Sequence, residues 1–322
     1  MKRKSVLLVA VLIAALVVGG CGQGKPPAQT GQSSQQGSTP KTFKIGLSEP
    51  NIAVAYRQAA VARAKAAASA GGANLVVTDA QGNNQKQLSD VQDLTSQKVD
   101  LVLMSPNEAQ ALVPAAKALA KAKIPLIIVD RTLGSDDYTA FIGSDNKAMG
   151  AKAAEYIAKL LNGKGNVVEL EGLQGASATT ERKEGFEKAI ANYSGIKIVA
   201  DQAGDYRRDK AFNVMQNIIQ ANSKIDAVYA HNDEMALGAV EALRKAGRLK
   251  GTIITGMDGE KAAFDAIKAG DMTATVQYPT FFPEAFELAM KVLKGEKVDK
   301  KIIKEAPLID HDNVAKYYDQ GI

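Results

Sequence analysis

The feature that most constrains this chain is a regular alternation of apolar strand-like segments and amphipathic helix-like segments, which begins at residue 42. Short apolar runs such as KIGLS (44–48), VDLVLMS (99–105) and IPLIIVD (124–130) are each followed by a segment with helical periodicity. Continuous apolar runs of this kind are typical of parallel strands that helices cover on both faces. The chain is therefore expected to be an α/β protein.

The pattern restarts after Gly143, and the complete series contains too many β-α units for a single sheet. We expect two similar doubly wound parallel-sheet (Rossmann-like) domains. A TIM barrel also repeats β-α units, but the number of expected strands exceeds the eight of a barrel, so the barrel ranks second. Strands are expected at 44–48, 73–79, 99–105, 124–130, 165–170, 196–201, 225–230, 252–258 and 273–277, and helices at 53–70, 84–97, 107–122, 146–161, 178–192, 206–221, 233–246, 259–269 and 281–294.

The N-terminus has the pattern of an export signal. Basic residues 2–4 precede a continuously apolar run from Val6 to Val18, and small residues lead to Cys21. This run is short for a membrane span, so it predicts a secretory signal at 1–20. The stretch Val18-Gly19-Gly20-Cys21 resembles the bacterial lipobox, which implies lipidation of Cys21. An ordinary signal peptide with an incidental cysteine is the alternative.

Residues 22–41 contain almost nothing that could form a core, so 21–41 is expected to be the lipidated cysteine and a flexible tether. Two acyl chains would anchor the protein stably at the membrane surface.

Charge and composition exclude several classes of function. Removing the three charges at Lys2, Arg3 and Lys4 from the formal +5 leaves +2, which gives no support to nucleic-acid binding. One cysteine and two histidines make an intramolecular disulfide impossible and predict no metal centre. Dinucleotide-binding, phosphate-loop and nucleophile-elbow signatures are absent, so we expect neither a cofactor nor an enzyme.

Polar residues that directly follow apolar strands are the candidate site, because open parallel sheets bind ligands beyond the carboxyl ends of their strands. Asp, Asn, Gln and Arg suit a polyhydroxylated neutral ligand, and a tyrosine ring can pack against the C–H face of a sugar. The candidates are Tyr56, Arg57, Asp130, Arg131, Arg182, Tyr206, Asn232, Asp258 and Gln277.

Structural explanations stand beside these candidates. Asp145 and Asp233 each open an expected helix and could be N-caps. Arg182 taken alone reads as a solvated helix charge, His231 could fill space at a strand end, and Tyr56 could belong to the core. The adjacent pair Asp130-Arg131 is harder to explain structurally.

Several long blocks resemble the sugar-binding proteins of ABC transporters, of the ribose and galactofuranose type. They include NLVVTDAQGN (74–83), VQDLTSQKVDLVLMSP (91–106), IPLIIVDR (124–131), VVELEGLQGASATTERKEGF (167–186), FNVMQNII (212–219), YAHNDEMALGAVEAL (229–243) and GMDG (256–259).

The resemblance implies two Rossmann-like lobes joined by a three-segment hinge and closing around a monosaccharide. It implies an N-terminal lobe of 42–144 plus 278–304 and a C-terminal lobe of 145–277 plus 305–322. The family's ligand positions correspond to Asp130, Arg131, Arg182, Asn232, Asp258 and Gln277, with Tyr206 at an aromatic position.

The first ligand loop differs from the ribose pattern of Asn-Pro and two Phe. Here Tyr56 is followed by Arg57, which is similar to the galactofuranose-binding branch, and Met257 stands where the ribose type has Phe. A pentose or a furanose-form hexose is therefore the expected ligand.

The resemblance implies a protein that delivers the sugar to an ABC transporter permease. With the N-terminal signal and Cys21, we expect an exported monomer that is lipid-anchored outside the cytoplasm. A receptor module that presents a sugar-like signal to a sensor kinase is the alternative. A transcriptional repressor of the same fold is disfavoured by the signal peptide, and a secreted sugar-processing enzyme has little support.

Overall fold

The computed structural model describes residues 42–322, and all structural statements below concern these residues. The predicted signal at 1–20 and the predicted lipidated cysteine and tether at 21–41 lie outside them. Two six-stranded sheets organise the described part of the chain. The predicted fold class, two doubly wound parallel-sheet domains, is confirmed, and the TIM-barrel alternative is wrong.

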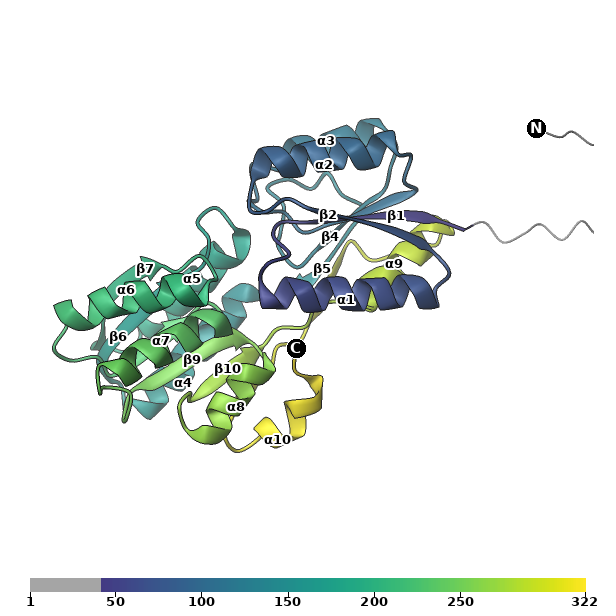
Figure 1. Cartoon of the computed structure of the whole chain (residues 1–322). Coiled ribbons are helices and arrows are strands. Elements are labelled where there is room, and N and C mark those ends of the chain that lie inside the picture. The colour runs from purple at the N-terminus through teal and green to yellow at the C-terminus, as the bar shows by residue number, and fades with distance from the viewer. Residues whose placement is uncertain (1–41) are drawn as a thin grey trace, which may run out of the picture. The chain divides into compact units, whose positions relative to one another are not determined.

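The first sheet has the strand order β11-β5-β4-β3-β1-β2, and all of its pairs are parallel. We call this sheet and its helices the N-terminal lobe. Figure 1 shows α2 and α3 on one face of the sheet and α1 and α9 on the other. Its elements are β1 (Lys44–Glu49), α1 (Ala55–Ala70), β2 (Asn74–Asp79), α2 (Asn84–Ser96), β3 (Leu101–Met104), α3 (Val113–Lys121), β4 (Leu126–Val129), β5 (Ala140–Ser144), α9 (Glu284–Leu293) and β11 (Lys301–Lys304).

The second sheet has the order β12-β10-β9-β8-β6-β7, and only the edge strand β12 is antiparallel to its neighbour. We call this sheet and its helices the C-terminal lobe. Its elements are α4 (Asn146–Leu160), β6 (Lys164–Glu171), α5 (Ser177–Ile190), β7 (Gly195–Ala203), α6 (Arg208–Ala221), β8 (Ala227–Ala230), α7 (Asp233–Lys245), β9 (Ile253–Asp258), α8 (Lys261–Ala269), β10 (Ala274–Gln277), β12 (Leu308–Asp310) and α10 (Val314–Tyr317).

The chain passes between the lobes three times. The passages lie between β5 and α4, between β10 and α9, and between β11 and β12. Because each passage follows the carboxyl end of a parallel strand, the same edges of the two sheets are brought toward each other.

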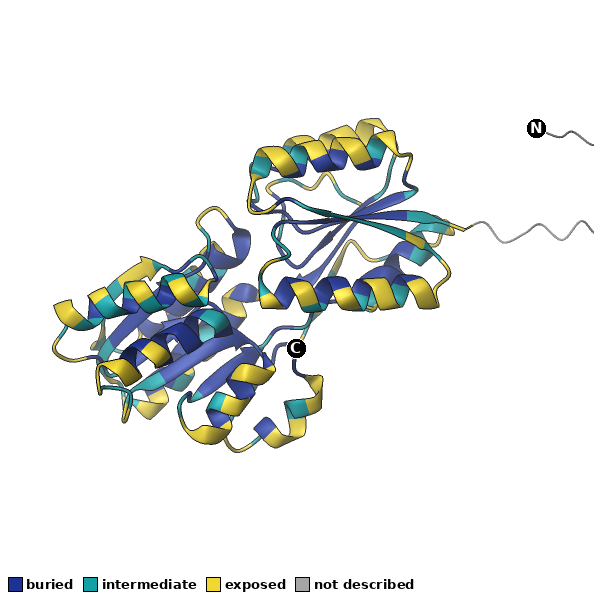
Figure 2. Ribbon diagram, in the orientation of Figure 1, coloured by how far each residue is buried: buried dark blue, intermediate teal, exposed yellow. Residues whose placement is uncertain are grey.

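Apolar side chains cover both faces of each sheet, as continuous apolar strands predict. One core lies under α2 and α3 and includes Leu94, Val102 and Leu119, and a second lies under α6, α7 and α8 and includes Met215 and Leu243. A third core includes side chains of both lobes, together with Tyr278 and Phe281 of the segment between β10 and α9. Figure 2 shows the buried strands and the helices exposed along their outer sides. This burial holds the strand ends in fixed positions.

Side-chain caps fix where several helices begin. Asp145 accepts a hydrogen bond from the Ala148 N–H at the start of α4, and Asn232 accepts one from the Met235 N–H at the start of α7, each at 3.0 Å. The N-cap explanation is confirmed for Asp145. For the second helix the cap is Asn232, so the same explanation for Asp233 is wrong.

The expected helix at 107–122 begins six residues later than predicted, at Val113. Pro114 is in the first turn, where its missing N–H costs nothing. Residues 107–112 instead form turns beside the carboxyl end of β3. Strands β5, β11 and β12 were not expected from the sequence.

Within residues 42–322, no helix is both long and apolar enough to span a membrane.

Candidate functional site

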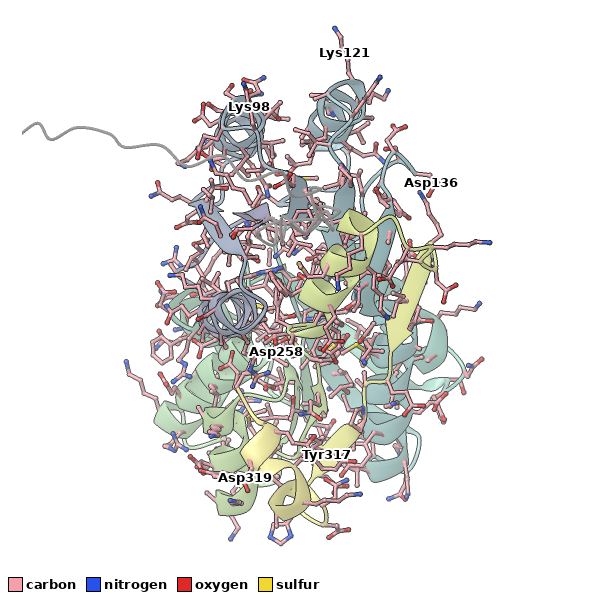
Figure 3. The ribbon with its side chains drawn as sticks, turned by 90° about the vertical axis from the view of Figure 1, so that its right-hand side faces the viewer. Lys98, Lys121, Asp136, Asp258, Tyr317 and Asp319 are labelled. Atoms are coloured by element: carbon pink, nitrogen blue, oxygen red, sulfur yellow. The ribbon has the colours of Figure 1, made fainter. Side chains whose placement is uncertain are left out.

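A cavity of about 190 Å³ is lined by residues from both lobes. Asp258, one of its lining residues, is labelled in Figure 3 between the lobe that carries Lys98 and the lobe that carries Tyr317. The structure brings together eight of the nine candidate residues around this cavity, namely Tyr56, Arg57, Asp130, Arg131, Arg182, Tyr206, Asn232 and Asp258.

Gln277 is the candidate that does not line this cavity. It borders a separate cavity of about 570 Å³ next to the crossing segments, which Asp258 also borders. Gln277 pairs with Asp258 in the register of β10 and β9. A ligand contact by Gln277 stays a prediction.

Arg57 is the centre of the N-terminal wall. Its guanidinium donates to Glu49 Oε2 at 3.2 Å and pairs with the Asp130 carboxylate, which also accepts from Ser105 Oγ at 3.1 Å. Glu49, Arg57 and Asp130 are all at most 5% exposed. Burial raises the pKa of Glu49 to about 7 despite Arg57. Burial alone would raise the pKa of Asp130, but Arg57 and Arg131 hold that pKa below its usual value.

Arg131 has no carboxylate partner among the described residues. It donates to the Asn107 carbonyl at 2.9 Å, and its guanidinium carbon lies 5.4 Å from the centre of the Tyr206 ring. Burial and the neighbouring Arg57 lower its pKa. A buried guanidinium with unused N–H donors favours a ligand that carries several acceptor oxygens.

Arg182 is the centre of the C-terminal wall. Its Nε donates to Asn146 Oδ1 at 2.9 Å, Nη1 donates to the His231 carbonyl, and Nη1 is 3.9 Å from Asp258 Oδ1. Its guanidinium also lies 4.8 Å from the centre of the Tyr278 ring. The side chain is 3% exposed, so the reading of Arg182 as a solvated helix charge is wrong.

Two glycines bring helices α4 and α5 close enough for the contact between Asn146 and Arg182. A Cβ at Gly150 would lie 2.2 Å from the Arg182 carbonyl oxygen, and one at Gly185 would lie 2.0 Å from the Lys147 carbonyl oxygen. Only glycine permits this approach of backbone to backbone.

Asp130, Tyr206 and Asp258 have positive φ angles of 71°, 61° and 123°. Non-glycine residues adopt these angles at a cost, and such strain clusters at functional sites. Here the strain coincides with three of the residues that line the cavity.

Asp258 is the acid of the C-terminal wall, and burial raises its pKa well above the usual value. Behind it, Asp233 Oδ2 accepts from the N–H groups of Gly259 and Glu260 at 2.8 and 2.9 Å, and Oδ1 accepts from Thr275 Oγ1 at 2.6 Å. Asp233 therefore fixes the turn that presents Asp258.

His231 is completely buried and does not line the cavity. Its Nδ1 accepts from the Gly172 N–H at 3.3 Å, and its Nε2 lies 2.8 Å from Glu169 Oε1. Burial lowers the pKa of His231 well below its usual value and raises that of Glu169 to about 8. The space-filling interpretation of His231 is confirmed.

Tyr56 is 5% exposed and belongs to the third core, while its hydroxyl donates to the Pro279 carbonyl at 2.8 Å. It is therefore a core residue that also reaches the cavity.

Sequence reasoning missed four polar lining residues: Asn51, Asp205, Arg207 and Tyr278. Tyr278 lies on the crossing segment after β10 and donates from its hydroxyl to the Asp130 carbonyl at 3.3 Å. Asn51 follows β1 closely, so the strand-end rule could have found it. Glu49, at the end of β1, could have been found by the same signal.

The site combines arginine donors, carboxylate and amide acceptors and tyrosine rings around one small cavity. No group of three or more metal-ligating side chains occurs within residues 42–322. Such a cavity between two lobes defines a protein that binds a small polar molecule.

The chain belongs to the periplasmic binding protein family, because the model for the periplasmic binding protein domain matches residues 45–297. It is 43% identical over 232 residues to the ribose import binding protein of Salmonella typhimurium, covering 71% of this chain and 78% of that protein. It is 38% identical over 284 residues to the ribose import binding protein of Bacillus subtilis, covering 88% and 91%.

Solved structures agree with this membership. The arabinose-transporter binding protein of Shewanella sp. ANA-3, solved with arabinofuranose, has a TM-score of 0.83 at 32% identity and covers 86% of this chain and 95% of its own. The fructose-binding periplasmic domain of a hybrid two-component system also has a TM-score of 0.83, at 34% identity, covering 86% and 94%.

Proposed function

We propose that this protein captures a monosaccharide between its two lobes and delivers it to the permease of an ABC transporter. The observation that carries the proposal is the convergence on one cavity of Asp130 and Arg131 from one lobe with Arg182, Asn232 and Asp258 from the other. A ligand that bonds to both walls favours the state in which the lobes are together, because only that state offers all the contacts.

The chemistry of the walls supports a neutral, polyhydroxylated ligand. Each hydroxyl both donates and accepts, so it can satisfy an arginine and a carboxylate in the same cavity. Asp130, which pairs with Arg57, and Asp258 offer carboxyl oxygens to hydroxyl donors in the same cavity as the arginines. The cavity of about 190 Å³ suits a single sugar ring rather than a polymer.

A pentose or a furanose-form hexose is the proposed ligand. Arg57 lines the cavity directly after Tyr56, and this pair carries the resemblance to the galactofuranose-binding branch. A 34% identical relative is the galactofuranose-binding protein of Escherichia coli, and the Shewanella protein was solved with arabinofuranose.

The proposed location is the outer surface of the cell membrane, with Cys21 as the lipid attachment point and 22–41 as the tether. The basic and apolar N-terminal segment and the family supply the support for export. We propose that the protein acts as a monomer. We also propose that it releases its ligand unchanged, since relatives are binding proteins.

Titration calorimetry with ribose, arabinose, galactose, fructose and myo-inositol tests the proposal. We expect one sugar to bind with micromolar or tighter affinity, which corresponds to about −8 kcal/mol. Arg131→Ala and Arg182→Ala should each weaken that binding about 10- to 100-fold, because each removes charge-assisted hydrogen bonds. Unchanged affinity in both variants would place the sugar elsewhere.

A receptor module for a sensor kinase is the second candidate, and the similarity to the fructose-binding domain of a two-component system favours it. The same sugar would bind the same cavity. Reconstituted transport separates the two: uptake of the sugar by vesicles that contain a permease requires the first function.

A further inference from the structure

We propose that Glu181 is the positioning residue of the site: it orients Arg182 through Asn146 and holds the two lobes together through Thr132. This inference rests on the proposed function, since it concerns the same cavity. Glu181 does not line the cavity itself.

A continuous chain of hydrogen bonds joins Thr132 to Arg182. Thr132 Oγ1 donates to Glu181 Oε1 at 3.0 Å, Asn146 Nδ2 donates to Glu181 Oε2 at 3.3 Å, and Arg182 Nε donates to Asn146 Oδ1 at 2.9 Å. Thr132 is the residue after Arg131, so this series of hydrogen bonds links Arg131 of the N-terminal wall to Arg182 of the C-terminal wall.

The direction of each bond in the chain is determined by chemistry. A guanidinium only donates, so Asn146 must present its oxygen to Arg182 and its NH₂ group away from it. That NH₂ group then needs an acceptor, and the Glu181 carboxylate supplies one. Asn146 is 1% exposed, so without Glu181 the N–H that bonds to this carboxylate would lose its acceptor at a buried position.

The other oxygen of Glu181 bonds across the gap between the lobes. Thr132 follows β4 of the N-terminal lobe, whereas Glu181 is on α5 of the C-terminal lobe. The Thr132 N–H also donates to Ser177 Oγ on α5 at 2.8 Å, and the Ala109 N–H donates to the Gly175 carbonyl at 3.2 Å. These contacts involve no cavity-lining polar group, so they stabilise the closed arrangement before a ligand arrives.

One carboxylate thus serves both tasks. When the lobes separate, Glu181 loses the bond to Thr132 but keeps the bond to Asn146, because Asn146 and Glu181 lie in the same lobe. Because the apparent affinity scales with the fraction of the binding-competent state, a contact that favours closure tightens ligand binding.

Four variants of the full chain test this role. Glu181→Leu removes both acceptors at similar size. Glu181→Gln is the conservative variant, because its amide oxygen can accept from Asn146 while its NH₂ donates to the Thr132 hydroxyl. Thr132→Val removes only the hydroxyl bond to Glu181 and keeps the backbone bond to Ser177. Glu184→Leu is the matched control one turn along α5, where Glu184 is 53% exposed and pairs with Lys147 on the surface.

The first readout is the NMR signal of the Arg182 Nε–H in the ligand-free protein, assigned by its loss in Arg182→Lys. We expect Glu181→Leu to shift this signal and speed its hydrogen exchange at least severalfold. Glu181→Gln, Thr132→Val and Glu184→Leu should keep it.

The second readout is the affinity for the sugar found by calorimetry. We expect losses of about 10- to 50-fold in Glu181→Leu and about 3- to 10-fold in Thr132→Val, with Glu181→Gln within about threefold and Glu184→Leu unchanged.

An Arg182 signal that Glu181→Leu leaves unchanged would overturn the positioning role. Equal losses in Glu181→Leu and Glu181→Gln, or identical behaviour of Glu181→Leu and Thr132→Val in both readouts, would also overturn it. If no sugar binds the wild-type protein, the proposed function fails, while the NMR readout still decides the role of Glu181.

Discussion

Replacing Glu49 with Gln should make the protein less sensitive to rising pH. Glu49 ends β1, is 1% exposed, and lies 3.2 Å from Arg57. Burial raises its pKa in the folded protein to about 7 from an ordinary 4.5. The folded state therefore takes up the Glu49 proton more readily than the unfolded state does. This contribution to stability is complete below pH 4.5 and is lost as the pH rises through 7.

The size of the effect follows from that pKa difference. At 1.36 kcal/mol per pKa unit, wild-type protein should lose about 3 kcal/mol relative to Glu49→Gln between pH 4.5 and pH 8. The loss corresponds to a difference in melting temperature of roughly 6–12 °C for a protein of this size.

Thermal unfolding followed by circular dichroism at half-unit pH steps measures the difference. The two proteins should melt within a few degrees of each other at pH 4.5 and diverge toward pH 8, with the variant more stable. Glu296→Gln, in the exposed turn after α9, is the control and should follow the wild type. Parallel curves for wild type and Glu49→Gln would refute the reasoning.

Two further predictions concern the support of the site. Gly185→Ala should destabilise the protein by about 1–3 kcal/mol in urea unfolding and weaken sugar binding, because the new Cβ would lie 2.0 Å from the Lys147 carbonyl oxygen. A variant as stable as the wild type would show that α4 can move away at no cost. Asp233→Ala should lower the free energy of unfolding by about 3 kcal/mol or more, because it leaves the Gly259 and Glu260 N–H groups and the Thr275 hydroxyl without their acceptor. A melting temperature within 2 °C of the wild type would contradict this account.

The sequence predicted the strands that are continuous apolar runs, since burial on both faces leaves a strong signal. It did not predict β5, β11 and β12. The edge strands β11 (KIIK) and β12 (LID) are four and three residues long and are partly exposed, so they carry little hydrophobic pattern. The start of α3 was predicted too early because the turn residues 107–112 (NEAQAL) have the same helix-favouring composition as the helix that follows.

Most of the cavity followed from one rule, that ligands bind beyond the carboxyl ends of parallel strands. The rule located Asp130, Arg131, Asn232 and Asp258. It could not assign Tyr278, because an aromatic residue on a crossing segment is equally typical of a core. Nor could it identify the partners of Arg182, since the approach of α4 and α5 depends on tertiary contacts at Gly150 and Gly185.

The most direct test of the central claim is a crystal structure of the protein with the tightest-binding sugar. The account predicts one sugar ring in the cavity, hydrogen-bonded to Arg131 of the N-terminal lobe and to Arg182 of the C-terminal lobe. A sugar bound to one lobe alone, or outside this cavity, would contradict it.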